Sequence, residues 1–169
     1  MHWEELNIIP HGLAQGWPSI LDFANLPRRV KNLCNHLLAI CDKRITSSYL
    51  DQAVHTWITI GRNKSQSLFY DMSSFDTEQP GYYGVQGFQI IYNTLHYMFL
   101  STTTIDYTTQ LACPILADYL VQKVLIPETA LSLIAEDFNT HRLNPLVQNT
   151  LNESRAYGAA MFPDEASSL

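Results

Sequence analysis

The chain has little charge, few cysteines and no long apolar run. Charged residues make up 15% of its 169 residues, below the roughly 25% that is usual for globular domains. The surface must therefore rely on Ser, Thr, Asn and Gln, a composition that suits contacts with a partner. No run of about 18 apolar residues occurs, and the N-terminus lacks the basic and then apolar pattern of a signal peptide. We therefore expect a protein that neither spans a membrane nor is secreted.

The three cysteines predict free thiols, because an odd number in a protein that is not secreted does not form a disulfide framework. Cys34, His36 and Cys41 come closest to a metal cluster. The two cysteines, however, fall on the apolar face of one predicted helix, where a thiol behaves as a small hydrophobic group, and His36 points elsewhere. We therefore predict neither a metal site nor a cofactor.

The charge is unevenly distributed along the chain. The net charge of −6 argues against a general binder of the phosphate backbone. Residues 1–64 hold seven Lys and Arg against five acids, whereas residues 65–169 hold three against eleven. A solvated surface is the simpler interpretation of the basic first part. Nucleic-acid binding remains an alternative there, and its candidate residues are Arg28, Arg29, Arg62 and Lys64.

The apolar spacing predicts an all-α fold, a single compact domain over residues 1–169 with about six helices. Residues 1–25 look like an irregular lead-in because Pro and Gly interrupt them, and residues 163–169 look frayed. Only Leu68–Met72 reads equally well as strand or helix. The predicted helices are 27–41, 48–61 with a cap at Ser47 or Ser48, 88–100, 106–124 with a kink at Pro114, 127–138, and 145–158 ending at Gly158.

No catalytic template fits the sequence. The nucleophile motif Gly-x-Ser-x-Gly is absent, and Gly61-Arg-Asn-Lys-Ser65 lacks the glycine that precedes the lysine of a phosphate-binding loop. Glu128 suits the first turn of a helix, and Glu136 and Asp137 read as solvated. We therefore predict that the chain is not an enzyme and keep an unrecognised enzyme as a third interpretation.

Two adjacent tyrosines form the most distinctive polar and aromatic spot. Tyr82 and Tyr83 lie between Pro80-Gly81 and Gly84. Tyrosine is enriched in interfaces because its ring buries area at little entropic cost. We therefore name Pro80, Gly81, Tyr82, Tyr83 and Gly84 as a candidate surface for a protein partner. The alternative is that both rings pack as a lid over the helical core.

Five segments in order resemble the C-terminal domain of the fungal restriction-of-telomere-capping proteins. They are Gly16–Phe23, Leu26–Val30, Pro80–Ile91, Val124–Phe138 and Glu153–Gly158, so the resemblance spans about residues 16–160, with residues 1–15 as a lead-in. It implies a nuclear and cytoplasmic fungal protein connected to telomere capping, without established catalytic residues. We therefore expect a non-catalytic protein–protein interaction domain. Its partner is a protein of unknown identity, and nucleic acid is the less favoured partner.

Overall fold

The computed structural model describes residues 3–61, 80–100 and 117–164, and every regular element in these ranges is helical. This confirms the all-α class. The elements are α1 (Trp3–Ala14), α2 (Leu26–Lys31), α3 (Cys34–Cys41), α4 (Ser48–Gly61), the short 3₁₀ helix η2 (Gly81–Tyr83), α6 (Gly84–Phe99), α8 (Ala117–Leu120), the π-helical η3 (Val121–Leu125), α9 (Ile126–Asp137), α10 (Pro145–Glu153) and α11 (Arg155–Met161).

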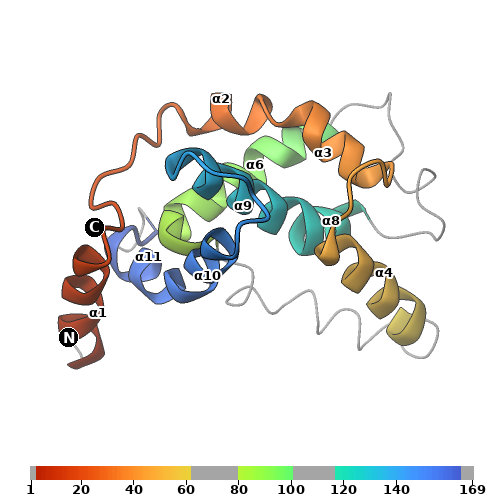
Figure 1. The fold of residues 1–169 in the computed structure, drawn as a ribbon. Helices are drawn as coiled ribbons and strands as arrows, with labels where there is room; N and C mark the ends of the chain where they lie inside the picture. Colours follow the sequence, from red (N-terminus) through yellow and green to blue (C-terminus); the bar gives the residue numbers. More distant parts are fainter. Residues whose placement is uncertain (1–2, 62–79, 101–116, 165–169) are drawn as a thin grey trace.

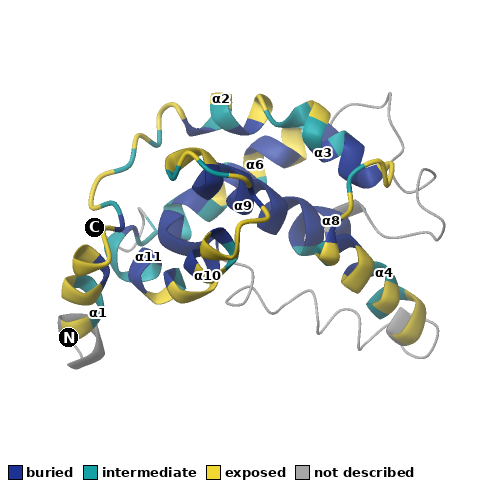
Figure 2. Cartoon of the chain, in the orientation of Figure 1, coloured by how far each residue is buried: buried dark blue, intermediate teal, exposed yellow. Residues whose placement is uncertain are grey.

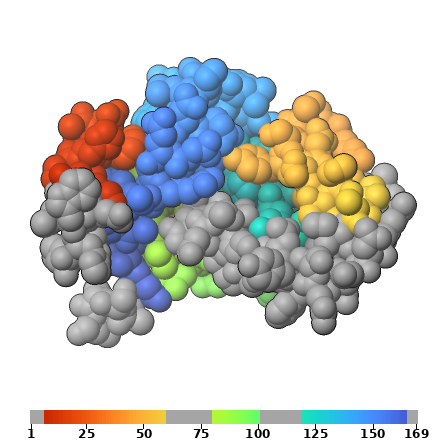
Figure 3. Space-filling view, turned by 90° about the horizontal axis from the view of Figure 1, so that it is seen from below, coloured from red at the N-terminus to blue at the C-terminus, as the bar shows by residue number. Residues whose placement is uncertain are grey.

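α9 is the central helix of the fold. All of its residues from Ile126 to Ala135 are buried, and it runs through the middle of the molecule (Figure 1, Figure 2). α2 packs on α6, α6 and α10 on α9, α4 against η3, α11 against η2 and α6, and α1 on α11. Figure 3 shows α1 (red), the α9–α10 region (light blue) and the α3–α4 region (orange) side by side along one edge. The described elements share one hydrophobic core.

The helix that contains Pro127 is longer than predicted. We expected it to begin at the proline, but α8, η3 and α9 follow one another without a break. In η3 the N–H of Ile126 donates to the carbonyl of Val121, five residues back. A proline has no N–H, and its ring presses on the carbonyl of the preceding turn. A wider π turn relieves that pressure, so the helix continues through the proline.

The predicted irregular lead-in contains a helix, α1. Pro10 lies inside it and is exposed, so its missing hydrogen bond faces solvent. Tertiary contacts hold the helix in place despite the proline. Gly12 lies against the ring of Tyr157, where an added Cβ would come within 2.0 Å of a ring carbon. Trp17 packs edge-on against the same ring at a centroid distance of 5.4 Å. The prediction was wrong because these contacts are remote in sequence.

Gly158 packs against a neighbouring segment instead of ending a helix. α10 ends at Glu153, and α11 runs through Gly158 to Met161. A Cβ at Gly158 would lie 2.2 Å from the carbonyl oxygen of Gly81, and a Cβ at Gly84 would lie 2.3 Å from the carbonyl oxygen of Gly158. Gly81 and Gly84 also adopt positive φ angles of 58° and 68°. These glycines let η2 and α11 approach at backbone distance.

The first two predicted helices are confirmed with one adjustment. The 27–41 helix is divided into α2 and α3 at Asn32–Leu33. α4 begins after Ser47, whose hydroxyl accepts the N–H of Leu50 at 3.2 Å, so Ser47 is the cap. α6 starts at Gly84, four residues before its predicted start at residue 88. Leu68–Met72, the Pro114 kink and the first part of the 106–124 helix lie outside the described residues.

Candidate functional site

The predicted docking segment Pro80–Gly84 is buried throughout. Tyr82 and Tyr83 are 0% and 1% exposed, and their rings stack at a centroid distance of 5.1 Å. The rings therefore do not form the exposed surface that we expected, and the alternative of a lid over the core describes their position. A partner could reach them only if the surrounding helices moved apart. Partner binding through these two rings stays a prediction.

The tyrosine hydroxyls belong to a polar group that we call the Arg29 cluster: Arg29, Tyr82, Tyr83 and Asp137. Both hydroxyls donate to the same oxygen of Asp137, each at 2.5 Å. Arg29 donates to the hydroxyl oxygen of Tyr83 at 3.0 Å and to the other oxygen of Asp137 at 3.0 Å. Burial, with Asp137 adding to it, raises the pKa of both tyrosines, so the hydroxyls remain donors. The hydrogen bonds of this cluster join α2 and η2 to the C-terminal end of α9.

This cluster changes the interpretation of two sequence predictions. Asp137 is exposed, as expected, but it also accepts three hydrogen bonds from buried or half-buried groups. Arg29 was a candidate for nucleic-acid binding, but Asp137 and Glu136 engage its guanidinium within the chain. Of the other candidates, Arg28 is exposed, and Arg62 and Lys64 lie outside the described residues. The described part of the chain thus leaves one of the four candidate cations on the surface and unengaged.

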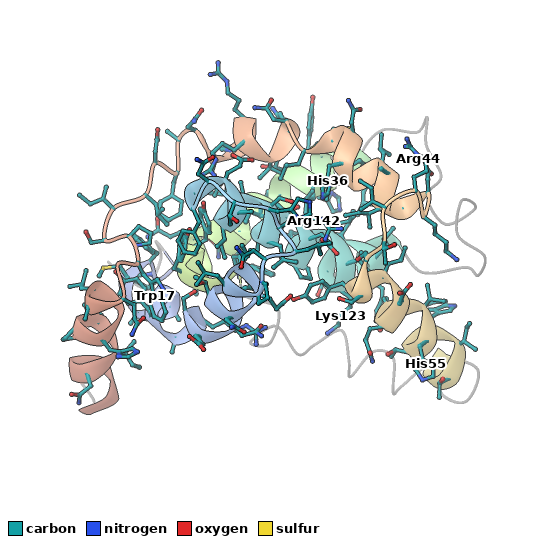
Figure 4. The ribbon with its side chains drawn as sticks, viewed as in Figure 1. Trp17, His36, Arg44, His55, Lys123 and Arg142 are labelled. Atoms are coloured by element: carbon teal, nitrogen blue, oxygen red, sulfur yellow. The ribbon has the colours of Figure 1, made fainter. Side chains whose placement is uncertain are left out.

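A second polar region surrounds an open hollow of about 820 Å³. It lies between α3, the α3–α4 loop, α9 and the α9–α10 loop, and we call it the α3/α9 hollow. It is lined by two kinds of side chain, apolar ones from Leu33, Ile45, Ala135 and Leu143 and polar ones from His36, Glu136, His141 and Arg142. Figure 4 shows His36 and Arg142 close together near the middle of the molecule, whereas Arg44 and His55 lie towards its edge.

A buried ion pair supports this hollow. Arg142 and Glu128 have side chains 8% and 1% exposed, and their nearest charged atoms are 3.5 Å apart. Ser47 donates its hydroxyl proton to Glu128, and Arg142 donates to the carbonyl of Thr46 at 2.8 Å. Burial raises the pKa of Glu128, and the contacts with Ser47 and Arg142 oppose that rise. The pair fixes both loops to α9 and thereby sets the shape of the hollow.

Two histidines differ in how they are held. The Nδ1 atom of His141 accepts the N–H of Leu143 at 3.1 Å, so the neutral ring carries its proton on Nε2. The Nε2 atom of His36 is buried without a hydrogen-bond partner. Burial, with the positive charges of Arg142 and His141, lowers the pKa of His36. The environment at His36 is therefore cationic and poorly solvated.

The hollow does not contain an acid–base relay among the described residues. His36 has no carboxylate partner, and a backbone N–H orients His141. No hydrogen bond joins Ser132, which also lines the hollow, to either histidine. Nucleophilic catalysis needs a nucleophile and a base within hydrogen-bond reach of each other. The arrangement suits binding better than this chemistry.

Cys41 is 1% exposed, and burial raises the pKa of its thiol to about 12, whereas Cys34 is half-buried. Cys41 therefore behaves as a core residue, as predicted.

Two kinds of feature are absent from the described ranges. No three His, Cys, Asp or Glu side chains in these ranges gather as a metal site would require. Within the same ranges, no helix has the length and apolar character needed to cross a membrane.

Comparison with protein families decides the family of this chain. The family model described as the RTC4-like domain matches residues 42–163. This chain belongs to the RTC4-like domain family. The match confirms the resemblance seen in the sequence, although the segments at 16–23 and 26–30 precede it. Comparisons with curated proteins and with solved structures return no match.

The boundary of the RTC4-like domain match runs through the α3/α9 hollow. Thr46, Glu128, His141 and Arg142 lie within the matched range, whereas Leu33 and His36 precede it. Sequence reasoning missed this site because its two halves are remote in the chain. One local signal was available. Glu128 interrupts a run that is otherwise apolar or small, and a charge on a buried helix needs a partner.

Proposed function

We propose that this RTC4-like domain is a non-catalytic protein-interaction domain, and that its docking surface is the α3/α9 hollow. The proposal extends to a nuclear or cytoplasmic fungal protein connected to telomere capping, as the family resemblance implies. The observation that carries it is an open hollow with apolar and polar walls beside two exposed leucines. Leu143 on its rim is 65% exposed, and Leu146 at the start of α10 is 54% exposed.

The shape of the hollow favours a protein segment over a small molecule. A site for a small ligand usually encloses most of that ligand's surface, whereas this hollow is wide open to solvent. An interface core combines apolar anchors with a polar rim. Leu143 and Ile45 offer the apolar contacts here, and His141 and Glu136 offer polar ones. The Arg29 cluster offers less, because its polar groups already bind one another.

Serine substitutions at the two leucines test this proposal. The Leu143→Ser/Leu146→Ser chain removes exposed apolar contacts, so its stability should change little. Partners recovered with the wild-type chain are identified by mass spectrometry and purified. Their affinity is then measured against both chains by calorimetry. We expect the double variant to bind at least about tenfold more weakly, because interface anchors contribute this much.

A matched control separates the hollow from general surface apolarity. Leu13 and Ile20 are 48% and 85% exposed and do not line the hollow. A Leu13→Ser/Ile20→Ser chain should bind the partner with the affinity of the wild type. Equal loss in both double variants, or no loss in either, would reject the hollow as the docking surface. Recovery of nucleic acid instead of protein, with loss on Arg28→Gln, would favour the alternative partner.

A further inference from the structure

The polar wall of the α3/α9 hollow presents hydrogen-bond donors. The neutral ring of His141 keeps a proton on Nε2, because its Nδ1 accepts the N–H of Leu143. Arg142 has five N–H groups, of which one meets the Thr46 carbonyl at 2.8 Å and another faces Glu128. Both residues stand in the same loop and line the same hollow. An occupant that binds these two residues must therefore supply acceptors.

The charges around the hollow favour a negatively charged acceptor. Glu136 is the acidic residue of the described lining, and it already faces Arg29 at 3.3 Å. Glu128 lies behind Arg142 and is 1% exposed, so it does not meet an occupant. The pKa of His36 is lowered first by burial and then by the charges of Arg142 and His141, so this part of the hollow disfavours a further positive charge. A carboxylate placed here would relieve that repulsion.

The rest of the chain limits the kind of anion. Its net charge is −6, so a polyanion such as nucleic acid or a long acidic tract is repelled over most of the surface. A single carboxylate contacts only the donors of His141 and Arg142. The same hollow is also lined by apolar side chains, those of Leu33, Ile45 and Leu143. The occupant that fits both kinds of lining has an acidic side chain next to an apolar one.

We propose that the α3/α9 hollow recognises an isolated Asp or Glu of the partner protein, flanked by an apolar residue, through His141 and Arg142. This inference rests on the proposed function and specifies which group of the partner its docking surface recognises. The carboxylate accepts hydrogen bonds from the ring of His141 and from the guanidinium of Arg142, and the neighbouring apolar side chain contacts the leucine and isoleucine side chains of the hollow. Charge-assisted bonds of this kind are stronger than neutral ones and give directional selectivity.

Two matched peptides test the carboxylate directly. The full chain, labelled at its histidines, is titrated with acetyl-Leu-Asp-Leu-amide and with acetyl-Leu-Asn-Leu-amide, and the ring signals are followed by NMR. We expect saturable shifts of His36 and His141 with the Asp peptide and at least about tenfold weaker binding of the Asn peptide. The bound carboxylate should also move the titration of His36 to higher pH, because a nearby negative charge favours the imidazolium.

Matched histidine variants identify which histidine binds the peptide. His141 and His55 are both exposed, but only His141 lines the hollow. His141→Gln should weaken the Asp peptide several-fold, and His55→Gln should leave it unchanged. Equal binding of the two peptides overturns the carboxylate and leaves the docking surface in place. If neither peptide shifts the hollow residues, both proposals fail. If a single-stranded DNA 12-mer displaces the Asp peptide and binds more tightly, the ligand is a phosphate.

Discussion

The Arg29 cluster and the α3/α9 hollow both adjoin the C-terminal half of α9, yet their polar groups are used differently. In the Arg29 cluster, two tyrosine hydroxyls and a guanidinium converge on Asp137, and each finds a partner within the chain. In the hollow, the Nε2 atom of His36 is buried without one, and His141 and Arg142 face an open space.

This contrast separates a structural polar cluster from a candidate binding site. Buried polar groups that satisfy one another join elements and leave nothing for a ligand. Polar groups that stay unpaired at a cavity open to solvent cost stability and persist where binding compensates for that cost. The tyrosine pair is the more conspicuous pattern in the sequence, but the hollow has the chemistry that remains available.

Glu128→Ala should give the largest loss of stability. The substitution leaves Arg142 buried without its counter-charge, and removing one member of a buried pair costs about 3–5 kcal/mol. Urea unfolding followed by circular dichroism measures the loss. Glu136→Ala is the control, because its exposed pairing with Arg29 contributes less than about 1 kcal/mol. A loss below that for Glu128→Ala would show that the pair does not support the hollow.

Asp137→Ala should come second, with a loss of about 2–3 kcal/mol, because it removes the acceptor of two buried hydroxyls. The same unfolding experiment reports the free energy. Arg29→Gln should cost less, since both hydroxyls keep Asp137 as their acceptor. If Asp137→Ala is neutral, the Arg29 cluster is not the structural group that this comparison describes.

A pair of smaller substitutions contrasts the two regions most sharply. Tyr83→Phe removes a satisfied hydroxyl and should cost about 1 kcal/mol. His36→Leu removes a buried nitrogen that has no partner, so unfolding should show a change within about 0.5 kcal/mol or a gain. A large loss on His36→Leu would mean that the ring has a structural partner, and the distinction between the two regions would fail.

The smallest expected effect is on the pH dependence of stability. The folded chain keeps His36 neutral to a lower pH than the unfolded chain, because burial and the charges of Arg142 and His141 lower its pKa. The unfolded chain then binds more protons, so stability falls as the pH drops below about 6.5. The His36→Leu chain lacks this contribution. Its free energy of unfolding, relative to the wild type, should therefore rise steadily from pH 7 to pH 5, as urea titrations at each pH would show. A constant difference would contradict the shift.

The sequence predicted the parts of the fold that local patterns determine. Ser47 caps α4 as expected, because a hydroxyl before an apolar helical stripe is a local signal. The helix predicted over 127–138 is present as α9, and Leu131 and Ile134 are buried in it. Gly158 was misread as a helix stop, since glycine signals both a helix end and a close backbone contact. Only the fold reveals the carbonyl of Gly81 beside it.

The candidate site was less predictable for the same reason. Arg142 lies in a loop and pairs with Glu128 on α9, and no spacing rule connects a loop position to a helix position. His36 was placed away from the apolar face of its helix, but the sequence could not show that the α9–α10 loop comes to meet it. Tyr82 and Tyr83 were identified as distinctive, but the acceptor of their hydroxyls, Asp137, lies more than fifty residues away.

Partner affinity, measured in parallel for the two regions, tests the central claim most directly. The purified partner is titrated against the wild type, the Leu143→Ser/Leu146→Ser chain and the Arg29→Gln chain, all at a temperature where each is folded. The account predicts at least about a tenfold loss for the hollow variant and an unchanged affinity for the Arg29 variant. Loss of binding in Arg29→Gln with full binding in the leucine variant would contradict it, and the tyrosine segment would be the working surface.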